Sequence, residues 1–282
     1  MSNAANPPDM APYLALNRAN WDERVGVHMG TRMYDLSDHR RGEARLAPIE
    51  MAALGDVSGL DVFHPQCHFG LDTMALLQMG AKSALGLDFS GKAIAAARDL
   101  ATEFGLADRA QFVEATVQDG IDHVLPGAFD LAFVTWGTIY WLPDLNAWAR
   151  LIAHALRPGG RLYFADGHPA MLVLDDSTPF ADGTPGYFVP YFHKDPFIFD
   201  DPGDYANETA VLKNSKTCEW MHTVSDIVMA LINAGLRIET LHEHDAIPWQ
   251  AFSCLVRGED RLYRWPDKAW LPLALSISAR KA

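Results

Sequence analysis

Cysteine is scarce in this 282-residue chain, which has only Cys67, Cys218 and Cys254. Three widely spaced cysteines argue against a disulfide framework and against a cysteine-rich zinc site. The HExxH motif of many zinc enzymes is also missing. His242 and His244 could face the same side of a strand and bind a metal, but polar residues at a strand end are the simpler interpretation. We therefore expect no metal.

Positive charge is scarce as well. The chain has 23 Lys and Arg residues against 36 Asp and Glu residues, and its net charge is −13. Only the dipeptide Arg40-Arg41 approaches a basic cluster. Because nucleic-acid binding requires a basic patch that replaces counterions, nucleic acids and anionic membranes are poor candidates for partners.

Long apolar runs are missing, although 49% of the residues are hydrophobic and can form a large core. No run approaches the roughly 18 residues that a membrane-spanning helix needs. Residues 1–9 lack the basic and then apolar pattern of a signal peptide, and Ser2-Asn3-Ala4 resembles a cloning remnant. We therefore expect a cytoplasmic protein.

From about residue 60 onward, predicted strands alternate with predicted helices. The strand candidates are Leu60–His64, Ala84–Asp88, Gln111–Ala115, Phe129–Thr135, Arg161–Asp166, Arg237–His242 and Leu273–Ala279. The helix candidates are Leu71–Met79, Lys92–Phe104, Asp144–Leu156 and Thr223–Ala234. This alternation predicts an α/β fold with a doubly wound, mostly parallel sheet and helices on both faces. Ligands of such sheets bind at the carboxyl ends of the strands.

The segment at about 168–220 interrupts this pattern and is rich in Pro, Gly, Asp and aromatic residues. A loop of this length is uncommon unless it has a functional role. We interpret it as a lid insertion after the fifth strand, with short strands of its own, that covers a pocket.

Residues 62–72 predict a strand, a tight loop and the start of a helix. Such a loop directs backbone N–H groups toward a ligand at the strand end. Asp88 ends the second strand, eighteen residues after Gly70, where a carboxylate can accept hydrogen bonds from a ribose diol. The alternative is that Asp88 only caps the helix after Ser90.

These features resemble the class I methyltransferases that use S-adenosylmethionine (SAM). In that family the first loop runs Asp/Glu-x-Gly-Cys/x-Gly-x-Gly. The chain matches it at Cys67 and Gly70, whereas His64 replaces the acid and Gln66 and His68 replace two glycines. Glycine permits a positive φ and a close approach of a ligand. Gln66 and His68 must therefore adopt the same backbone path although they carry side chains.

Four later segments also resemble this family, and the resemblance covers roughly residues 45–170 and the last two strands. They are Leu87–Ser90, Phe112–Asp119, Phe129–Asp144 and Leu156–Leu162. The resemblance implies a Rossmann-like, seven-stranded sheet of order 3-2-1-4-5-7-6 whose last strand is antiparallel. It further implies an N-terminal helical cover over residues 1–45, a SAM-binding domain over 46–282, and methyl transfer to a small molecule.

The same resemblance implies a cofactor site. Its expected members are Tyr34, Gln66, Cys67, His68, Gly70, Asp88, Phe89, Thr116, Val117, Gln118, Thr135 and Trp136. Cys67 is interpreted as a small buried residue beside the cofactor and not as a nucleophile. Thr116 stands where the family usually has an Asp that contacts adenine. Trp136 either stacks near the ligand or belongs to the core.

A hydroxyl, phenol or ammonium acceptor needs a base that removes its proton, and histidine suits this role at neutral pH. We favour His222 and His193 as candidate bases, with Tyr140 holding or polarising the acceptor. The candidate substrate-binding residues are His168, which is also a possible base, Tyr191, Trp220 and Trp249. Each of these side chains could instead have a structural role.

Three other functions remain open at this stage. The altered first loop could belong to a non-catalytic SAM-binding protein. A nicotinamide-dependent oxidoreductase would use a related fold, but the chain lacks the GxGxxG motif at this loop. A SAM-dependent enzyme could also perform a different reaction, since a fold does not determine chemistry. The oligomeric state is likewise undetermined, and a homodimer is one possibility.

Overall fold

The computed structural model describes residues 10–282. The stretch 1–9, which carries the expectations about a signal peptide and a cloning remnant, lies outside the described residues.

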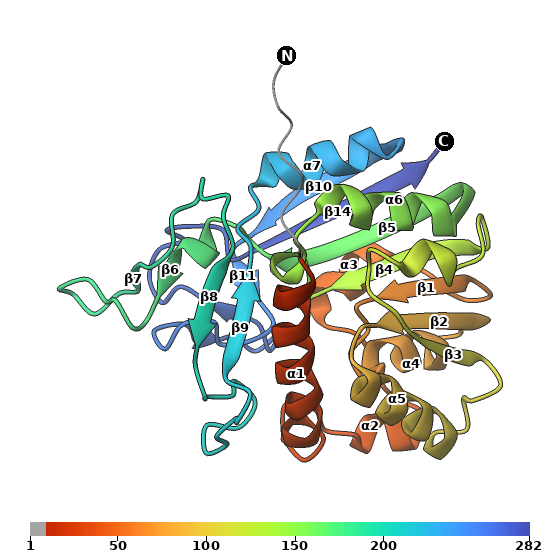
Figure 1. The fold of residues 1–282 in the computed structure, drawn as a ribbon, viewed down its shortest axis with the longest axis horizontal. Coiled ribbons are helices and arrows are strands. Elements are labelled where there is room, and N and C mark those ends of the chain that lie inside the picture. Colours follow the sequence, from red (N-terminus) through yellow and green to blue (C-terminus); the bar gives the residue numbers. More distant parts are fainter. Residues whose placement is uncertain (1–9) are drawn as a thin grey trace.

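A seven-stranded sheet forms the centre of the molecule, in the order β10-β14-β5-β4-β1-β2-β3 (Figure 1). Its strands are β1 (Asp61–Pro65), β2 (Ser83–Asp88), β3 (Ala110–Glu114), β4 (Phe129–Thr135), β5 (Leu156–Gly167), β10 (Leu236–His244) and β14 (Ala274–Lys281). The first five pair in parallel, and β14 is antiparallel to both β5 and β10. The expected fold class and strand order are therefore confirmed.

Helices cover both faces of this sheet (Figure 1). The helices α3 (Pro48–Leu54), α4 (Leu71–Gln78) and α5 (Gly91–Glu103) pack on one face, and α2 (Ser37–Arg41) lies beside α4. The helices α6 (Leu145–Ala155) and α7 (Val224–Asn233) pack on the other face. Two apolar cores result, and every residue of β4 is buried between them, as its apolar run predicts.

The helix α1 (Ala11–His28) stands beside the carboxyl ends of the parallel strands (Figure 1). Asp22 accepts a hydrogen bond from the Ser90 hydroxyl at the start of α5. Asn17 donates to the backbone oxygen of Cys218 and accepts from its N–H, both at 2.7 Å. These contacts join α1 to the sheet domain on one side and to the insertion on the other.

Short elements make up the insertion after β5. They are η3 (Met171–Val173), β6 (Leu174–Asp175), β7 (Gly186–Tyr187), β8 (Phe197–Asp200) and β9 (Lys216–Glu219). The strand pairs β6–β7 and β8–β9 are antiparallel hairpins. Two further single-turn helices, η1 (Gly120–Asp122) and η2 (Ile139–Trp141), follow β3 and β4. A small sheet of β11 (Ala246–Ile247), β12 (Val256–Arg257) and β13 (Tyr263–Arg264) precedes β14.

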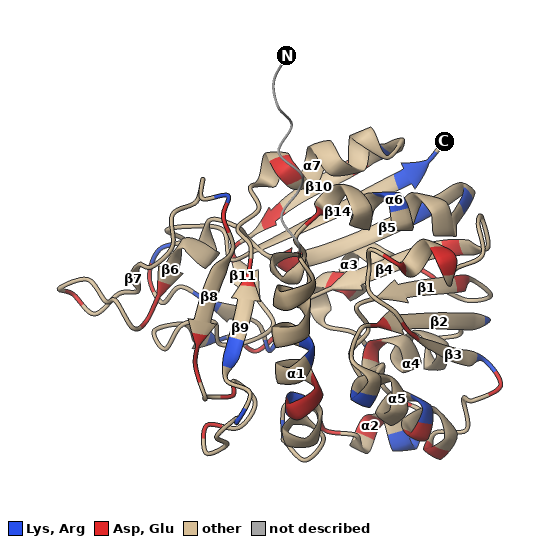
Figure 2. Cartoon of the chain, in the orientation of Figure 1, with Lys and Arg blue, Asp and Glu red and all other residues tan. Residues whose placement is uncertain are grey.

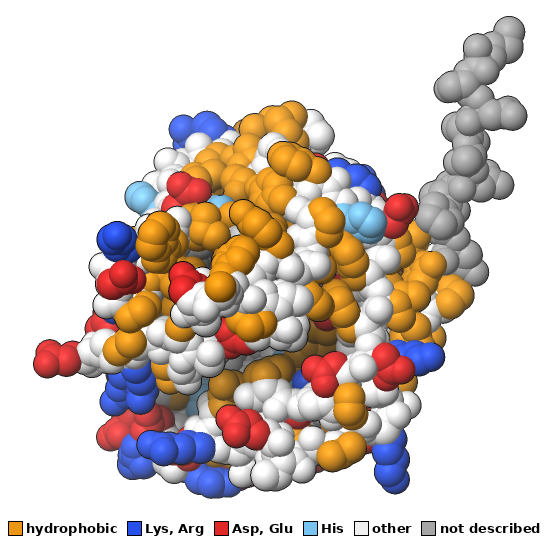
Figure 3. Space-filling view, turned by 90° about the vertical axis from the view of Figure 1, so that its left-hand side faces the viewer, with side chains coloured by type: hydrophobic (Ala, Val, Ile, Leu, Met, Phe, Trp, Pro, Cys, Tyr) orange, Lys and Arg blue, Asp and Glu red, His pale blue; other side chains and the backbone are white. Residues whose placement is uncertain are grey.

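Acidic and basic residues are interspersed over the helices and loops of the described residues (Figure 2). On the face that carries the insertion, hydrophobic side chains gather in the upper half and the surface is hollowed below them (Figure 3). The exposed apolar side chains of the insertion include Tyr187, Phe192 and Ile198. Among the described helices, none has the length and apolar character that a membrane span requires.

Gly86 allows β2 to pack closely under the first loop. A Cβ at this position would lie 2.6 Å from Phe112 Cδ1 and 2.8 Å from Cys67 Sγ. We expect Gly86→Ala to destabilise the protein by about 1–3 kcal/mol, because neither neighbour can move without disturbing the core. Chemical denaturation measures this change. Gly26→Ala in α1, with nothing within 4 Å of the added methyl group, should instead stabilise by about 0.5–1 kcal/mol.

Candidate active site

The loop after β1 keeps the backbone conformation of a glycine-rich loop without its glycines. Gln66 and His68 have φ values of 58° and 52°, in the left-handed region, and Gly70 follows at 77°. This conformation costs a residue with a Cβ roughly 1–2 kcal/mol. Backbone strain of this kind persists where the surrounding structure enforces it, often at functional sites.

Asp88 enforces the loop conformation. One carboxylate oxygen accepts a hydrogen bond from the His68 N–H at 2.8 Å, and the other accepts from the Ser90 N–H at 2.9 Å. The hydroxyl of Ser90, and not Asp88, caps α5 by accepting from the Ala93 N–H. Burial raises the pKa of Asp88 to about 6, although these backbone hydrogen bonds favour its ionised form. Asp88 is thus a buried carboxylate at the joint between the loop and β2.

A small cavity of about 30 Å³ lies beside Asp88. Its walls are Leu14, Gln66, Leu87, Asp88, Phe89, Ala115, Thr116, Val117, Gln118, Trp141 and Leu142. Six of the predicted cofactor residues therefore meet here. Gln118 Nε2 and Gln66 Oε1 are buried and have no hydrogen-bond partner among the described residues. The cavity thus offers one unpaired donor, one unpaired acceptor and a carboxylate between apolar walls. These groups suit the polar groups of a nucleoside.

This cavity is narrow. About 30 Å³ holds only one or two water molecules, far less than an adenosyl group. Leu14 of α1 and Trp141 of η2 form two of the walls. Entry of a nucleoside consequently requires these walls to move.

Cys67 and Gly70 belong to the loop but do not line the cavity. Cys67 is 4% exposed, and burial raises the pKa of its thiol well above the usual value, so the sulfur is a poor nucleophile. A Cβ on Gly70 would lie 2.6 Å from a ring atom of Phe112. Both residues thus support the loop through close packing.

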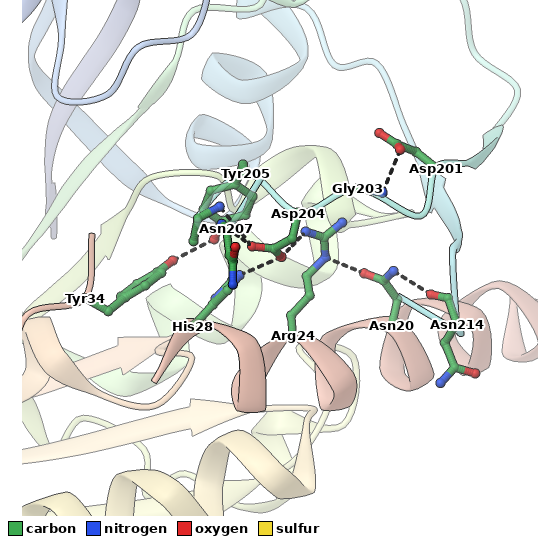
Figure 4. Close-up of polar contacts among 11 residues, drawn as sticks. Asn20, Arg24, His28, Tyr34, Asp201, Gly203, Asp204, Tyr205, Asn207 and Asn214 are labelled. Carbon is green, nitrogen blue, oxygen red and sulfur yellow. Dashed lines mark hydrogen bonds and ion pairs between the residues drawn. The ribbon is translucent and has the colours of Figure 1, made fainter. Parts of the chain in front are cut away.

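His68 extends away from the cavity into an aromatic cluster. Its ring lies 5.3 Å from Trp21, 5.2 Å from His28 and 5.7 Å from Tyr34, measured between ring centroids. The hydroxyl of Tyr34 forms a hydrogen bond of 2.6 Å with that of Tyr205 in the insertion. The N-terminal segment and the insertion therefore meet here through Tyr34 and Tyr205 (Figure 4).

Asp204 is the polar centre of this junction (Figure 4). Its Oδ2 accepts from Arg24 Nη1 at 2.7 Å and lies 3.0 Å from His28 Nε2. Its Oδ1 accepts from the N–H groups of Ala206 and Asn207. Burial lowers the pKa of His28, an effect that the Asp204 charge opposes. A single buried carboxylate thus joins α1 to residues 204–207.

A second acidic residue organises the loop after β4. Asp166, at the end of β5, accepts hydrogen bonds from the N–H groups of Gly137, Thr138 and Ile139 at 2.6, 2.8 and 3.2 Å. This arrangement places η2, with Tyr140 and Trp141, over the carboxyl ends of the strands.

Glu219 in β9 lies beside Tyr140, and sequence reasoning missed it. Burial raises the pKa of Glu219 to about 7, and Glu219 is the strongest electrostatic neighbour of the Tyr140 hydroxyl. Asn17 fixes the residue before it, and the Trp220 N–H donates to the Tyr140 oxygen at 2.8 Å. The signal available in the sequence was an acid that stands between two apolar residues, Cys218 and Trp220.

Residues 62–160 match the family model of a methyltransferase domain. That range contains the loop after β1, Asp88 and β4, and it lies in a sheet with the strand order described above. These residues therefore form a methyltransferase domain, and the sheet that contains them has the class I methyltransferase fold. No curated protein matches the chain in sequence.

Solved structures share the fold of this chain at low sequence identity. A SAM-dependent methyltransferase from Mesorhizobium loti is 24% identical, with 83% of this chain and 96% of that chain covered and a TM-score of 0.58. Geranyl diphosphate C-methyltransferase from Streptomyces coelicolor is 14% identical, with coverages of 98% and 100% and a TM-score of 0.58. The 1,6-didemethyltoxoflavin-N1-methyltransferase from Burkholderia thailandensis is 18% identical, with coverages of 99% and 92% and a TM-score of 0.52.

The histidines that we favoured as bases have other partners and do not line the cavity beside Asp88. His222 Nε2 is 2.7 Å from the backbone oxygen of Leu142, and burial lowers the pKa of this imidazole. Its ring lines a different cavity of about 330 Å³ between the start of α6 and α7. His193 packs against Phe197, with ring centroids 4.3 Å apart. Neither imidazole borders the cavity beside Asp88.

The four candidate substrate residues also have local partners. His168 Nε2 is 3.0 Å from Glu243 Oε1, and the Tyr191 hydroxyl accepts from the N–H of Val224 at the start of α7. Trp220 lines the cavity of about 330 Å³. Trp249 packs edge-on against Trp136, with 5.6 Å between the ring centroids.

Trp136 and Thr135 lie at the end of β4, away from the cavity beside Asp88. Trp136 has a φ of 49°, and its indole N–H donates to Glu50 Oε1. Thr135 lies beside Asp72 of α4. These contacts place the two predicted residues next to a pair of acids.

Replacing Asp88 tests its role in cofactor binding. We expect Asp88→Asn to weaken the affinity for SAM by about tenfold to a hundredfold, because the amide removes a charged acceptor and places an NH₂ group toward backbone donors. Isothermal titration measures the affinity. Asp99→Asn, on the exposed face of α5, should leave it unchanged. Affinity retained in Asp88→Asn would remove this residue from the cofactor site.

Replacing Asp204 tests the junction between α1 and the insertion. We expect Asp204→Asn to destabilise the protein by about 3–5 kcal/mol, because the change leaves Arg24 without its buried ionic partner. Hydrogen exchange should then accelerate first in α1 and in residues 201–215. Asp201→Asn is the matched control, since this exposed carboxylate accepts only from the nearby Gly203 N–H, and its effect should stay within about 0.5 kcal/mol.

Proposed function

We propose that this methyltransferase transfers the methyl group of SAM to a small-molecule acceptor bound beneath the insertion. The observation that carries the proposal is the narrow cavity beside Asp88, with the unpaired polar atoms of Gln66 and Gln118 in its wall. In this arrangement Asp88 accepts hydrogen bonds from the ribose hydroxyls, and Gln118 Nε2 donates to a ring nitrogen of adenine.

In this proposal the remaining cofactor contacts are assigned from where the side chains lie around the cavity. Phe89, Thr116 and Val117 form the walls around the adenine, with Thr116 already bonded to Asp119 through its hydroxyl. Tyr34 packs against the ring of His68, and in our proposal the amino-acid end of the cofactor extends toward these two side chains.

The proposed reaction is an in-line displacement, for which bound SAM supplies the sulfonium leaving group. The protein therefore mainly orients the acceptor and excludes water. In our proposal Tyr140 donates a hydrogen bond to the acceptor atom, and Glu219 takes the proton that a hydroxyl or ammonium acceptor loses. A carboxylate whose pKa burial raises to about 7 suits proton transfer near neutral pH.

Two observations favour a small acceptor. The N-terminal segment and the insertion close over the strand ends, which leaves little access for a macromolecule. Two of the structurally similar proteins are named after small-molecule acceptors, geranyl diphosphate and 1,6-didemethyltoxoflavin.

This function is tested by two measurements. The first is titration with SAM and S-adenosylhomocysteine, and the second is turnover with a panel of phenols, amines and thiols. Binding of both cofactor forms together with turnover of at least one acceptor class supports the proposal. Tight binding without turnover across the panel would instead favour a non-catalytic SAM-binding protein, which the altered first loop first suggested.

The proposed base is tested with an acceptor that gives turnover. We expect Glu219→Gln to lower kcat at least a hundredfold with an unchanged SAM affinity, since general-base catalysis typically contributes 10²–10⁴-fold. The wild-type rate should rise with pH through about 7, where Glu219 ionises, and the variant should lack this limb. His222→Gln is the competing variant. A larger loss of kcat in His222→Gln would return the role of base to that histidine.

A further inference from the structure

Two carboxylates, Glu50 of α3 and Asp72 in the first turn of α4, lie near each other close to the first loop. Glu50 is 1% exposed, and its Oε1 accepts from the indole N–H of Trp136. Its Oε2 is buried and has no hydrogen-bond partner among the described residues. The hydroxyl of Tyr163, whose residue is also 1% exposed, lacks a partner in the same part of the molecule.

Burial of these two carboxylates lowers the stability of the fold. Burial, and then the charge of Asp72, raise the pKa of Glu50 to about 8, and burial raises the pKa of Asp72 to about 6. The groups that favour ionisation of Glu50 are the Trp136 N–H and backbone N–H groups, and not a basic side chain. Buried carboxylates without a cation are usually retained for function and not for stability.

The position of the pair relates it to the cofactor loop. Asp72 lies two residues after Gly70 and beside Thr135, at the carboxyl end of β4. The neighbouring end of β1 carries no acid, because His64 stands there. Burial lowers the pKa of His64 to about 3, and its Nδ1 lies 2.8 Å from the Thr73 hydroxyl. The chain thus has a neutral side chain at the end of β1 and two acids on the helices beside it.

We propose that Glu50 and Asp72 form a cation site that binds the ammonium group at the amino-acid end of SAM. The inference rests on the proposed function, which places the ribose at Asp88, at the other end of the loop. Asp72 begins the helix that follows this loop, whereas Tyr140 and Glu219 belong to η2 and the insertion, so the ammonium of the cofactor fits the pair better than that of an acceptor. Trp136 orients Glu50 Oε1 and leaves Oε2 for the ligand.

Replacement of Glu50 separates binding from stability. We expect Glu50→Gln to weaken the affinity for S-adenosylhomocysteine at least tenfold. Its affinity for 5′-methylthioadenosine, which lacks the amino-acid end, should change less than twofold. Isothermal titration with both probes measures the difference. Asp72→Asn should show the same selective loss, and Glu103→Gln, exposed on α5, should change neither affinity.

The stability of Glu50→Gln provides a second readout. The raised pKa of Glu50 means that its protonated form stabilises the fold at low pH, and that this contribution is lost as pH rises toward about 8. The groups facing Glu50 are Asp72, Trp136 and Tyr163, and none of them is a cation. Glu50→Gln should therefore raise Tm at pH 8 and have little effect near pH 4. A residue with only a structural role would instead lower Tm when it is replaced.

Three results would overturn the proposal. Unchanged affinity for S-adenosylhomocysteine in both variants would exclude a role for the pair in binding. An equal loss for both probes would show that the pair shapes the whole site and does not recognise an ammonium group. Failure of the wild-type protein to bind either probe would refute the proposed function itself, together with this inference.

Discussion

The candidate site depends on the hydrogen bond between the Asp88 carboxylate and the His68 N–H. This contact joins the loop after β1 to the end of β2 and keeps His68 in a left-handed conformation without glycine. The loop conformation directs the His68 ring into the junction of α1 and the insertion, and it directs Gln66 into the wall of the cavity. Loss of this bond would therefore affect the cavity and its cover together.

Much of the sheet could be predicted because its signals are local. The apolar run of β4, the Ser90 cap of α5 and the capping box at Thr223 each lie within a few residues of the element that they define. The strand order had no such local signal. It was expected from the resemblance to a family and not from the alternation of strands and helices. Boundaries shifted where pairing overrides a turn signal, as in β5, which begins at Leu156 although Pro158, Gly159 and Gly160 predict a later start.

The candidate site was harder to predict because its key contacts join distant segments. Arg24 and Asp204 are 180 residues apart, and Trp136 and Glu50 are 86 apart. No periodicity or spacing in one sequence connects such pairs. Glu219 was missed for a related reason, since its environment comes from α1 and η2 and not from its neighbours in β9.

The distribution of hydrogen bonds also explains why acids, and not histidines, carry the proposed chemistry. His64, His168 and His222 each have a partner that restrains the imidazole, and burial lowers the pKa of all three. In contrast, Glu50 retains an unpaired oxygen, and burial raises the pKa values of Glu50 and Glu219 toward neutrality. A buried acid near its pKa can gain a cation or a proton with little reorganisation. The energetic cost of burying these acids is thus concentrated where a ligand can offset it, which is the arrangement expected of a binding site.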